Sequence, residues 1–206
     1  MRSTDGSTGP TGTATRPDPD GRVRRFGPAE RRVHRATGCL MLVCVVSAAC
    51  LYLGPLAQLV GRRALLVTVH EWSGILLPAP FLLGLRSAAF RADLRRLNRR
   101  PAKKFNTGQK IYAGWIAGAV PVMMFTGLLM WFMGLAPFIS RTSAIFVHDL
   151  LAWAVVFVIL GHVRKALADP EARLGMRTGH VSRSWARRQH PGWLREEDEE
   201  TGRTVE

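Results

Sequence analysis

Long apolar stretches separated by basic connections dominate the pattern of this sequence. Four stretches are almost free of charge: Ala36–Val60, Ala64–Leu85, Ile111–Ser140 and Thr142–Val163. A helix needs about 20 apolar residues, at about 1.5 Å per residue, to cross a hydrocarbon core of roughly 30 Å. We therefore predict an all-α fold, a four-helix transmembrane bundle over residues 26–168.

The positive charge of the chain lies between these stretches. Lys and Arg number 29 against 15 Asp and Glu, which gives a formal net charge of +14. A mean hydropathy of +0.04 would suit a soluble protein, but this average hides the segregation of apolar and basic residues. Because the charge lies in the connections, we exclude nucleic acid as a partner and expect membrane lipid around the bundle.

The distribution of Arg and Lys also predicts the orientation of the bundle. Segments 23–35, 86–110 and 164–188 are strongly basic, whereas the two short connections carry only Arg62, Arg63 and Arg141. Positive charge near span ends stays in the cytoplasm. We therefore expect a multi-pass protein of the cell inner (plasma) membrane with both termini in the cytoplasm.

The two ends of the chain differ from the bundle in composition. The first 22 residues are rich in Ser, Thr, Gly, Pro and Asp, so we expect a disordered leader over residues 1–25. Residues 169–206 are basic and then acidic. We expect them to form a mostly disordered cytoplasmic tail, with His180 and His190 in solvent.

Three cysteines, Cys39, Cys44 and Cys50, lie in the first apolar stretch without C-x-x-C spacing. This spacing excludes a zinc ribbon, a thioredoxin-type motif and a c-type haem attachment. We interpret these cysteines as small buried hydrophobic residues.

Four of the six histidines lie in or beside the apolar stretches, where ionisable side chains are costly and usually functional. With the orientation above, His34 and His162 lie at the inner edge of the membrane. His70 and His148 each lie about 9 Å from the outer edge. The depths therefore match in two pairs, and each pair joins two different helices.

The last apolar stretch supplies one histidine to each pair. His148 and His162 are 14 residues apart, which places them on nearly the same helix face and about 21 Å apart along the axis. Two facing imidazoles suit the axial positions of a haem iron. We predict two b-type haems, an inner one on His34 and His162 and an outer one on His70 and His148. The offset excludes a zinc or copper site, whose three or four ligands must converge on one point.

Small residues follow the four histidines at the i+4 position, on the same helix face. They are Gly38, Gly74, Ala152 and Ala166. We interpret them as haem-contacting positions that leave flat space for a porphyrin. Close helix–helix packing is the alternative interpretation of the glycines.

Several segments resemble the cytochrome b, or gamma, subunit of respiratory formate dehydrogenase. They are ERRVHRATG (30–38), VHEWSGILLP (69–78), KKFNTGQKIYAGW (103–115) and RTSAIFVHDLLAWAVVFVILGHV (141–163). The resemblance implies four helices that hold two b haems with the same histidine pairing. It also implies a quinone site at the inner haem, formed by Asn106, Gly108 and His162. From the residues alone, a helix cap or loop is the favoured interpretation of the polar turn 106–109.

The resemblance implies a function as the membrane anchor of a formate dehydrogenase-type complex. Such a subunit, itself without substrate chemistry, passes electrons from an iron–sulfur partner subunit and its catalytic dehydrogenase subunit across the membrane to menaquinone or ubiquinone. The same pattern also fits a subunit of a nickel–iron hydrogenase or of a sulfur-compound or molybdenum reductase. A proton channel or small transporter that uses the histidines with Glu71 and Asp149 is an alternative from another class.

Overall fold

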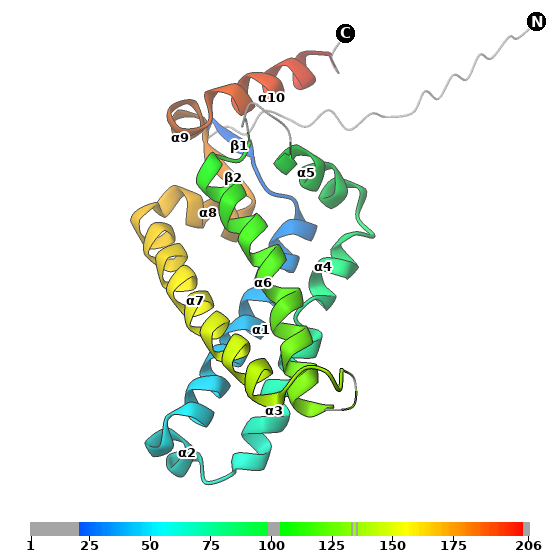
Figure 1. Ribbon diagram of the computed structural model, residues 1–206. Coiled ribbons are helices and arrows are strands. Elements are labelled where there is room, and N and C mark those ends of the chain that lie inside the picture. The colour runs from blue at the N-terminus through cyan, green and yellow to red at the C-terminus, as the bar shows by residue number, and fades with distance from the viewer. Residues whose placement is uncertain (1–20, 99–103, 133, 135, 204–206) are drawn as a thin grey trace, which may run out of the picture.

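The computed structural model describes residues 21–98, 104–132, 134 and 136–203. Helices dominate this part of the chain (Figure 1). In chain order, the elements are β1 (Arg22–Arg24), α1 (Pro28–Tyr52), α2 (Gly54–Val60), α3 (Arg63–Leu76), α4 (Ala79–Gly84), α5 (Ala88–Asn98), α6 (Thr107–Trp131), α7 (Arg141–Ala168), α8 (Pro170–Thr178), β2 (His180–Ser182), α9 (Arg183–Gln189) and α10 (Pro191–Arg203).

Four helical segments of the described chain are long and apolar enough to cross a membrane. They are α1, the α3–α4 segment Arg63–Gly84, α6 and α7. The second span is interrupted between α3 and α4, where Pro78 lacks an amide hydrogen for the helix ladder. The prediction of an all-α fold with four transmembrane helices is confirmed.

The ends of two spans differ from the apolar stretches that predicted them. The first helix begins at Pro28, eight residues before Ala36, because Pro at the start of a helix is favourable and charged residues can extend a helix beyond the membrane. It ends at Tyr52, just before Gly54 and Pro55 begin the short helix α2. The third span ends at Trp131, so its last apolar residues lie outside helix α6.

The spans form two helical hairpins. Helix α1 packs along α3 and α4, and α6 packs along α7, while α3 also touches α6. Figure 1 shows both ends of the described chain and α5 at one end of the bundle, with α2 and the start of α7 at the other. This arrangement puts the connection between the hairpins on the same side as both ends of the described chain.

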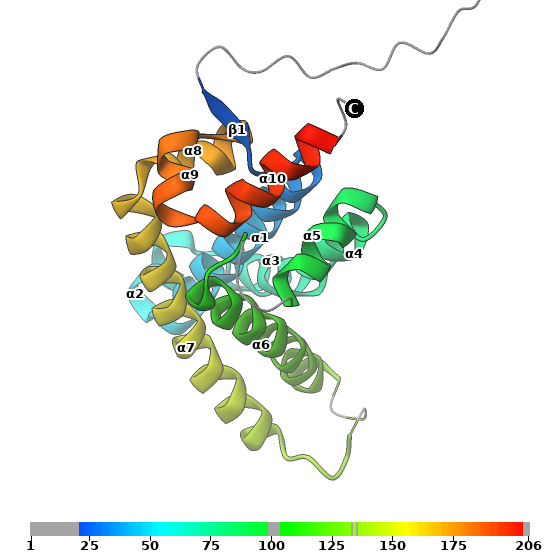
Figure 2. The same ribbon diagram turned by 90° about the horizontal axis from the view of Figure 1, so that it is seen from above.

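Helices α8, α9 and α10 gather with β1 and β2 over one end of the bundle (Figures 1 and 2). We call residues 21–27 and 169–203 the terminal cap. Strands β1 and β2 pair antiparallel, with Val23 opposite Val181. The core of the cap is a cluster of buried residues: Val181, Trp185, Ala186, Trp193 and Leu194.

The guanidinium of Arg25 fills the centre of this cap and is 3% exposed. It lies 4.9 Å from the ring centroid of Trp185 and 5.0 Å from that of Trp193. It donates to the Lys104 carbonyl at 2.8 Å and to His190 Nε2 at 2.9 Å. Burial lowers the pKa of Arg25 to about 10, against the attraction of nearby carboxylates.

Two expectations about the chain ends therefore differ from the structure. The tail 169–206 was expected to be mostly disordered, but its described part folds onto the N-terminal strand. His190 was expected in solvent, but it is buried beside Arg25. The reason is that β1, from the other end of the chain, pairs with β2, and Arg25 packs on the Trp185 and Trp193 rings of the core. Of the leader expected over residues 1–25, residues 1–20 lie outside the described part of the chain.

Candidate haem-binding site

The four histidines of the spans lie in two pairs that each join the two hairpins. His34 on α1 faces His162 on α7, with ring centroids 6.2 Å apart. His70 on α3 faces His148 on α7, with ring centroids 6.3 Å apart. The structure thus brings together the pairs whose depths match in the sequence. Because α7 is unbroken from Arg141 to Ala168, the two pairs are stacked about 21 Å apart along it.

The spacing of each pair fits one metal ion between the two rings. An iron bound by two imidazole nitrogens at about 2 Å places the ring centres about 6 Å apart. The interplanar angles are 48° for His34 and His162, the predicted inner pair, and 74° for His70 and His148, the predicted outer pair, so neither pair is a parallel ring stack. These residues therefore have the geometry and the donor chemistry to hold two haem irons.

Hydroxyl groups bond to the Nδ1 atoms of the outer pair. Ser47 Oγ on α1 lies 3.0 Å from His70 Nδ1, and the Cys44 carbonyl lies 3.1 Å from the same nitrogen. Thr126 Oγ1 on α6 lies 2.9 Å from His148 Nδ1. With Nδ1 engaged in this way, Nε2 of each ring is the nitrogen available to a metal.

The inner pair has a different environment. Tyr112 on α6 stacks on His162, with ring centroids 4.8 Å apart and planes 16° apart. Arg31 and Arg35, which flank His34 on α1, both donate to the carbonyl of Arg177 at the end of α8, at 2.9 and 3.0 Å. These two arginines therefore tie the terminal cap to the inner end of the site.

Space beside the histidines is open at the predicted glycines. A methyl group added at Gly38 or Gly74 would meet no other atom within 4 Å, so these glycines do not serve close helix packing. Ala152 and Ala166 on α7 are half-buried. A methyl group added at Gly127 on α6, in contrast, would lie 3.4 Å from the ring of His148. Gly127 therefore lets that imidazole approach α6 closely.

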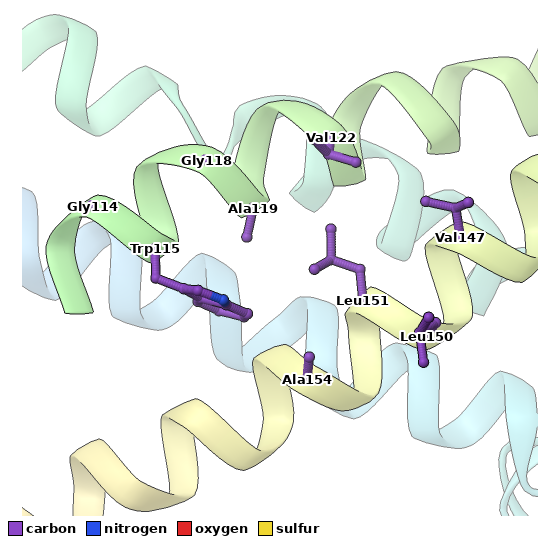
Figure 3. Close-up of a pocket in the computed structure, with 9 residues that line it drawn as sticks. All are labelled: Gly114, Trp115, Gly118, Ala119, Val122, Val147, Leu150, Leu151 and Ala154. Atoms are coloured by element: carbon purple, nitrogen blue, oxygen red, sulfur yellow. The ribbon is translucent and has the colours of Figure 1, made fainter. Parts of the chain in front are cut away.

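A cavity of about 610 Å³ lies along the groove between α6 and α7 (Figure 3). Its lining is apolar: Gly114, Trp115, Gly118, Ala119, Val122, Val147, Leu150, Leu151 and Ala154. Trp115 and Leu151 point into the space between the two helices. This lining has the chemistry of a site for an apolar chain.

The turn that the resemblance linked to a quinone forms a helix cap. Asn106 Oδ1 accepts a hydrogen bond from the Gln109 amide at 2.8 Å, and Gln109 Oε1 accepts one from the Asn106 amide at 3.0 Å. Gly108 lies within this capped first turn of α6. Tyr112, which stacks on His162, follows Asn106 by six residues, about 9 Å along α6. The turn therefore lies at the same end of the bundle as the inner histidine pair.

Sequence reasoning did not identify three residues that contact the histidines: Ser47, Tyr112 and Thr126. Small hydroxyl residues are common in membrane helices, so Ser47 and Thr126 gave no distinct signal. Tyr112 was contained in the NTGQKIY segment, close to the inner end of its span. Its stacking depends on the rotation of α6 against α7, which a sequence does not fix.

Comparison with known proteins gives two results. The profile of the family described as "Prokaryotic cytochrome b561" matches residues 25–174. The chain is similar to the nitrate-inducible formate dehydrogenase cytochrome b556(Fdn) subunit of Escherichia coli K12, with 31% identity over 96 residues. That match covers 45% of this chain and 44% of the relative, so it spans less than half of each.

Two further relatives carry similar names. The cytochrome b556(fdo) subunit of formate dehydrogenase from Escherichia coli K12 is 26% identical over 205 residues, covering 89% of this chain and 97% of the relative. The formate dehydrogenase cytochrome b556 subunit of Haemophilus influenzae is 31% identical over 97 residues, covering 46% of this chain and 41% of the relative. The similarity thus extends in one case over nearly the full length of both chains.

Proposed function

Because this chain belongs to the prokaryotic cytochrome b561 family, we propose that it is a membrane-anchoring cytochrome b subunit with two haems. It would pass electrons from an iron–sulfur subunit of a formate dehydrogenase-type complex to a quinone. The observation that carries the proposal is the pair of histidine couples with ring centroids 6.2 and 6.3 Å apart. Haem b supplies one-electron chemistry when it is bound.

The chain's own residues would hold the two haems and set their spacing. His34 and His162 would hold the inner haem, and His70 and His148 would hold the outer one. Each couple takes one ring from each hairpin, so binding joins α1 and α3 to α7. The unbroken helix α7 fixes the distance between the couples, about 21 Å over 14 residues.

We place the inner couple on the cytoplasmic side. The terminal cap and α5 lie at that end (Figure 1), and their Arg and Lys residues favour the cytoplasm. Asn106, Gly108 and His162 are then the proposed quinone site, with Gly38, Gly74, Ala152 and Ala166 beside the haems. Quinone protonation would draw on cytoplasmic protons, and inward electron transfer would add to the membrane potential.

The choice of formate dehydrogenase as the partner complex rests on the similarity to the cytochrome b556 subunits of that enzyme. A hydrogenase or a sulfur-compound reductase would use the same two couples. The contacts of the outer histidines argue against a proton relay through Glu71 and Asp149. The Nδ1 atom of His70 is hydrogen-bonded to Ser47 and the Cys44 carbonyl, and that of His148 to Thr126, instead of to these carboxylates.

Haem quantification on the purified full-length chain tests the proposal. We expect two haem b per chain and a low-spin bis-imidazole absorption spectrum. A colourless protein would support the relay and contradict the proposal, and one haem per chain would contradict the two-couple assignment. In membranes that contain the native complex, formate should reduce both haems and an added quinone should reoxidise them. Reduction by hydrogen instead of formate would identify a hydrogenase as the partner.

A further inference from the structure

Two buried hydroxyl groups hold the outer histidines in equivalent ways. Ser47 is 4% exposed and Thr126 is 6% exposed. Each comes from the other helix of the hairpin that carries its histidine, α1 for His70 and α6 for His148. The outer couple is therefore flanked on both sides by a hydroxyl from a neighbouring helix.

The hydrogen-bond network assigns the direction of both contacts. Thr126 Oγ1 has one hydrogen, which it donates to the Val122 carbonyl at 2.8 Å. Its lone pairs therefore accept from His148 Nδ1–H. Ser47 Oγ likewise donates to the Val43 carbonyl at 2.6 Å, so it can accept from the Nδ1–H of His70. Both imidazoles are thus held as the tautomer whose Nε2 has a free lone pair.

We propose that Ser47 and Thr126 are positioning residues that set the reduction potential of the outer haem. This inference rests on the proposed function. A ligand imidazole whose second nitrogen donates a hydrogen bond is fixed in orientation and is a stronger electron donor. Stronger donation stabilises the ferric state, which lowers the reduction potential. With haem bound, the hydroxyls would therefore give the outer site a lower reduction potential than it would have without them.

Both histidines also have a backbone partner. The Cys44 carbonyl lies 3.1 Å from His70 Nδ1, and the backbone of Met123 is hydrogen-bonded to His148. The loss of either hydroxyl therefore removes the side-chain acceptor and leaves a backbone one, so we expect Ser47 and Thr126 to influence the potential to a similar extent.

Redox titration of haem-loaded variants tests this inference. We use His162→Ala as the background, so that only the outer haem remains to be titrated. Thr126→Val, which has nearly the same shape without an acceptor, should shift the potential to more positive values and change the low-spin electron paramagnetic resonance signal. Ser47→Ala should give a positive shift of similar size, and Thr126→Ser should retain the original potential.

Ser73→Ala is the matched control. Ser73 is also buried on α3, but its hydroxyl donates to the His70 carbonyl and does not contact an imidazole. The variant Ser73→Ala should leave the reduction potential of the outer haem unchanged.

An unchanged potential in haem-loaded Thr126→Val would overturn the inference. If Thr126→Val does not bind the outer haem, the potential of Thr126→Cys is measured instead, because its thiol is a weaker acceptor. An unchanged potential in that variant would also overturn the inference. An unmutated protein without haem would instead refute the proposed function, so the two failures are distinguishable.

Discussion

The ring of Tyr112 lies flat on the imidazole of His162, with centroids 4.8 Å apart and planes 16° apart. The contact joins the first third of α6 to the inner end of α7. It restricts the rotation of the imidazole, because a stacked ring cannot turn without separating from its neighbour. The inner couple is thus oriented by stacking, whereas the outer couple is oriented by hydrogen bonds.

Replacing Tyr112 tests the stacking contact. We expect Tyr112→Leu to lower the occupancy of the inner haem and to broaden its low-spin electron paramagnetic resonance signal, because His162 gains rotational freedom. Tyr112→Phe keeps the ring and should retain both properties. Equal loss in both variants would assign the role to the phenol hydroxyl and contradict the stacking argument.

Removing a ligand of the inner couple tests the independence of the two sites. His162→Ala should abolish the inner haem and quinone reduction, while the dehydrogenase still reduces the outer haem. The reason is that His70 and His148 face each other without His162. The measurement is haem content per chain, which should fall from two to one. Loss of both haems from a folded protein would show that the sites are coupled.

Filling the space beside His70 tests the small-residue pattern. Gly74→Leu should lower the occupancy of the outer haem, because Gly74 lies one turn from His70 and faces open space. Gly54→Leu is the control, since a methyl group added there also meets no atom within 4 Å, but it lies at the start of α2. If haem content per chain is unchanged by Gly74→Leu, this glycine has no role in haem binding.

The pairing of the histidines could be predicted because it depends on helix geometry alone. The positions of His70 and His148 along their spans set their depths, and the 14-residue spacing in α7 sets a common face. The contacts of Ser47 and Thr126 could not be predicted in this way. They depend on how far α1 rotates against α3 and α6 against α7, and side-chain packing decides that rotation.

The terminal cap escaped prediction for a different reason. Its tail has few apolar residues between many charges, which is typical of disordered segments. The core forms because Arg25 lies between Trp185 and Trp193, about 160 residues away in the sequence. Two tryptophans within nine residues of a basic tail were the available signal.

The same arginine leads to a prediction about the stability of the cap. Arg25→Met should destabilise α9 and α10 by about 3 kcal/mol, because it removes a desolvated cation–π contact and the donor to the Lys104 carbonyl. Hydrogen exchange measured by mass spectrometry should then be about 100-fold faster in these helices. Arg24→Met, at the preceding position but exposed, is the matched control and should leave exchange unchanged. Equal exchange in the two variants would show that Arg25 is not required to hold the ends of the chain together.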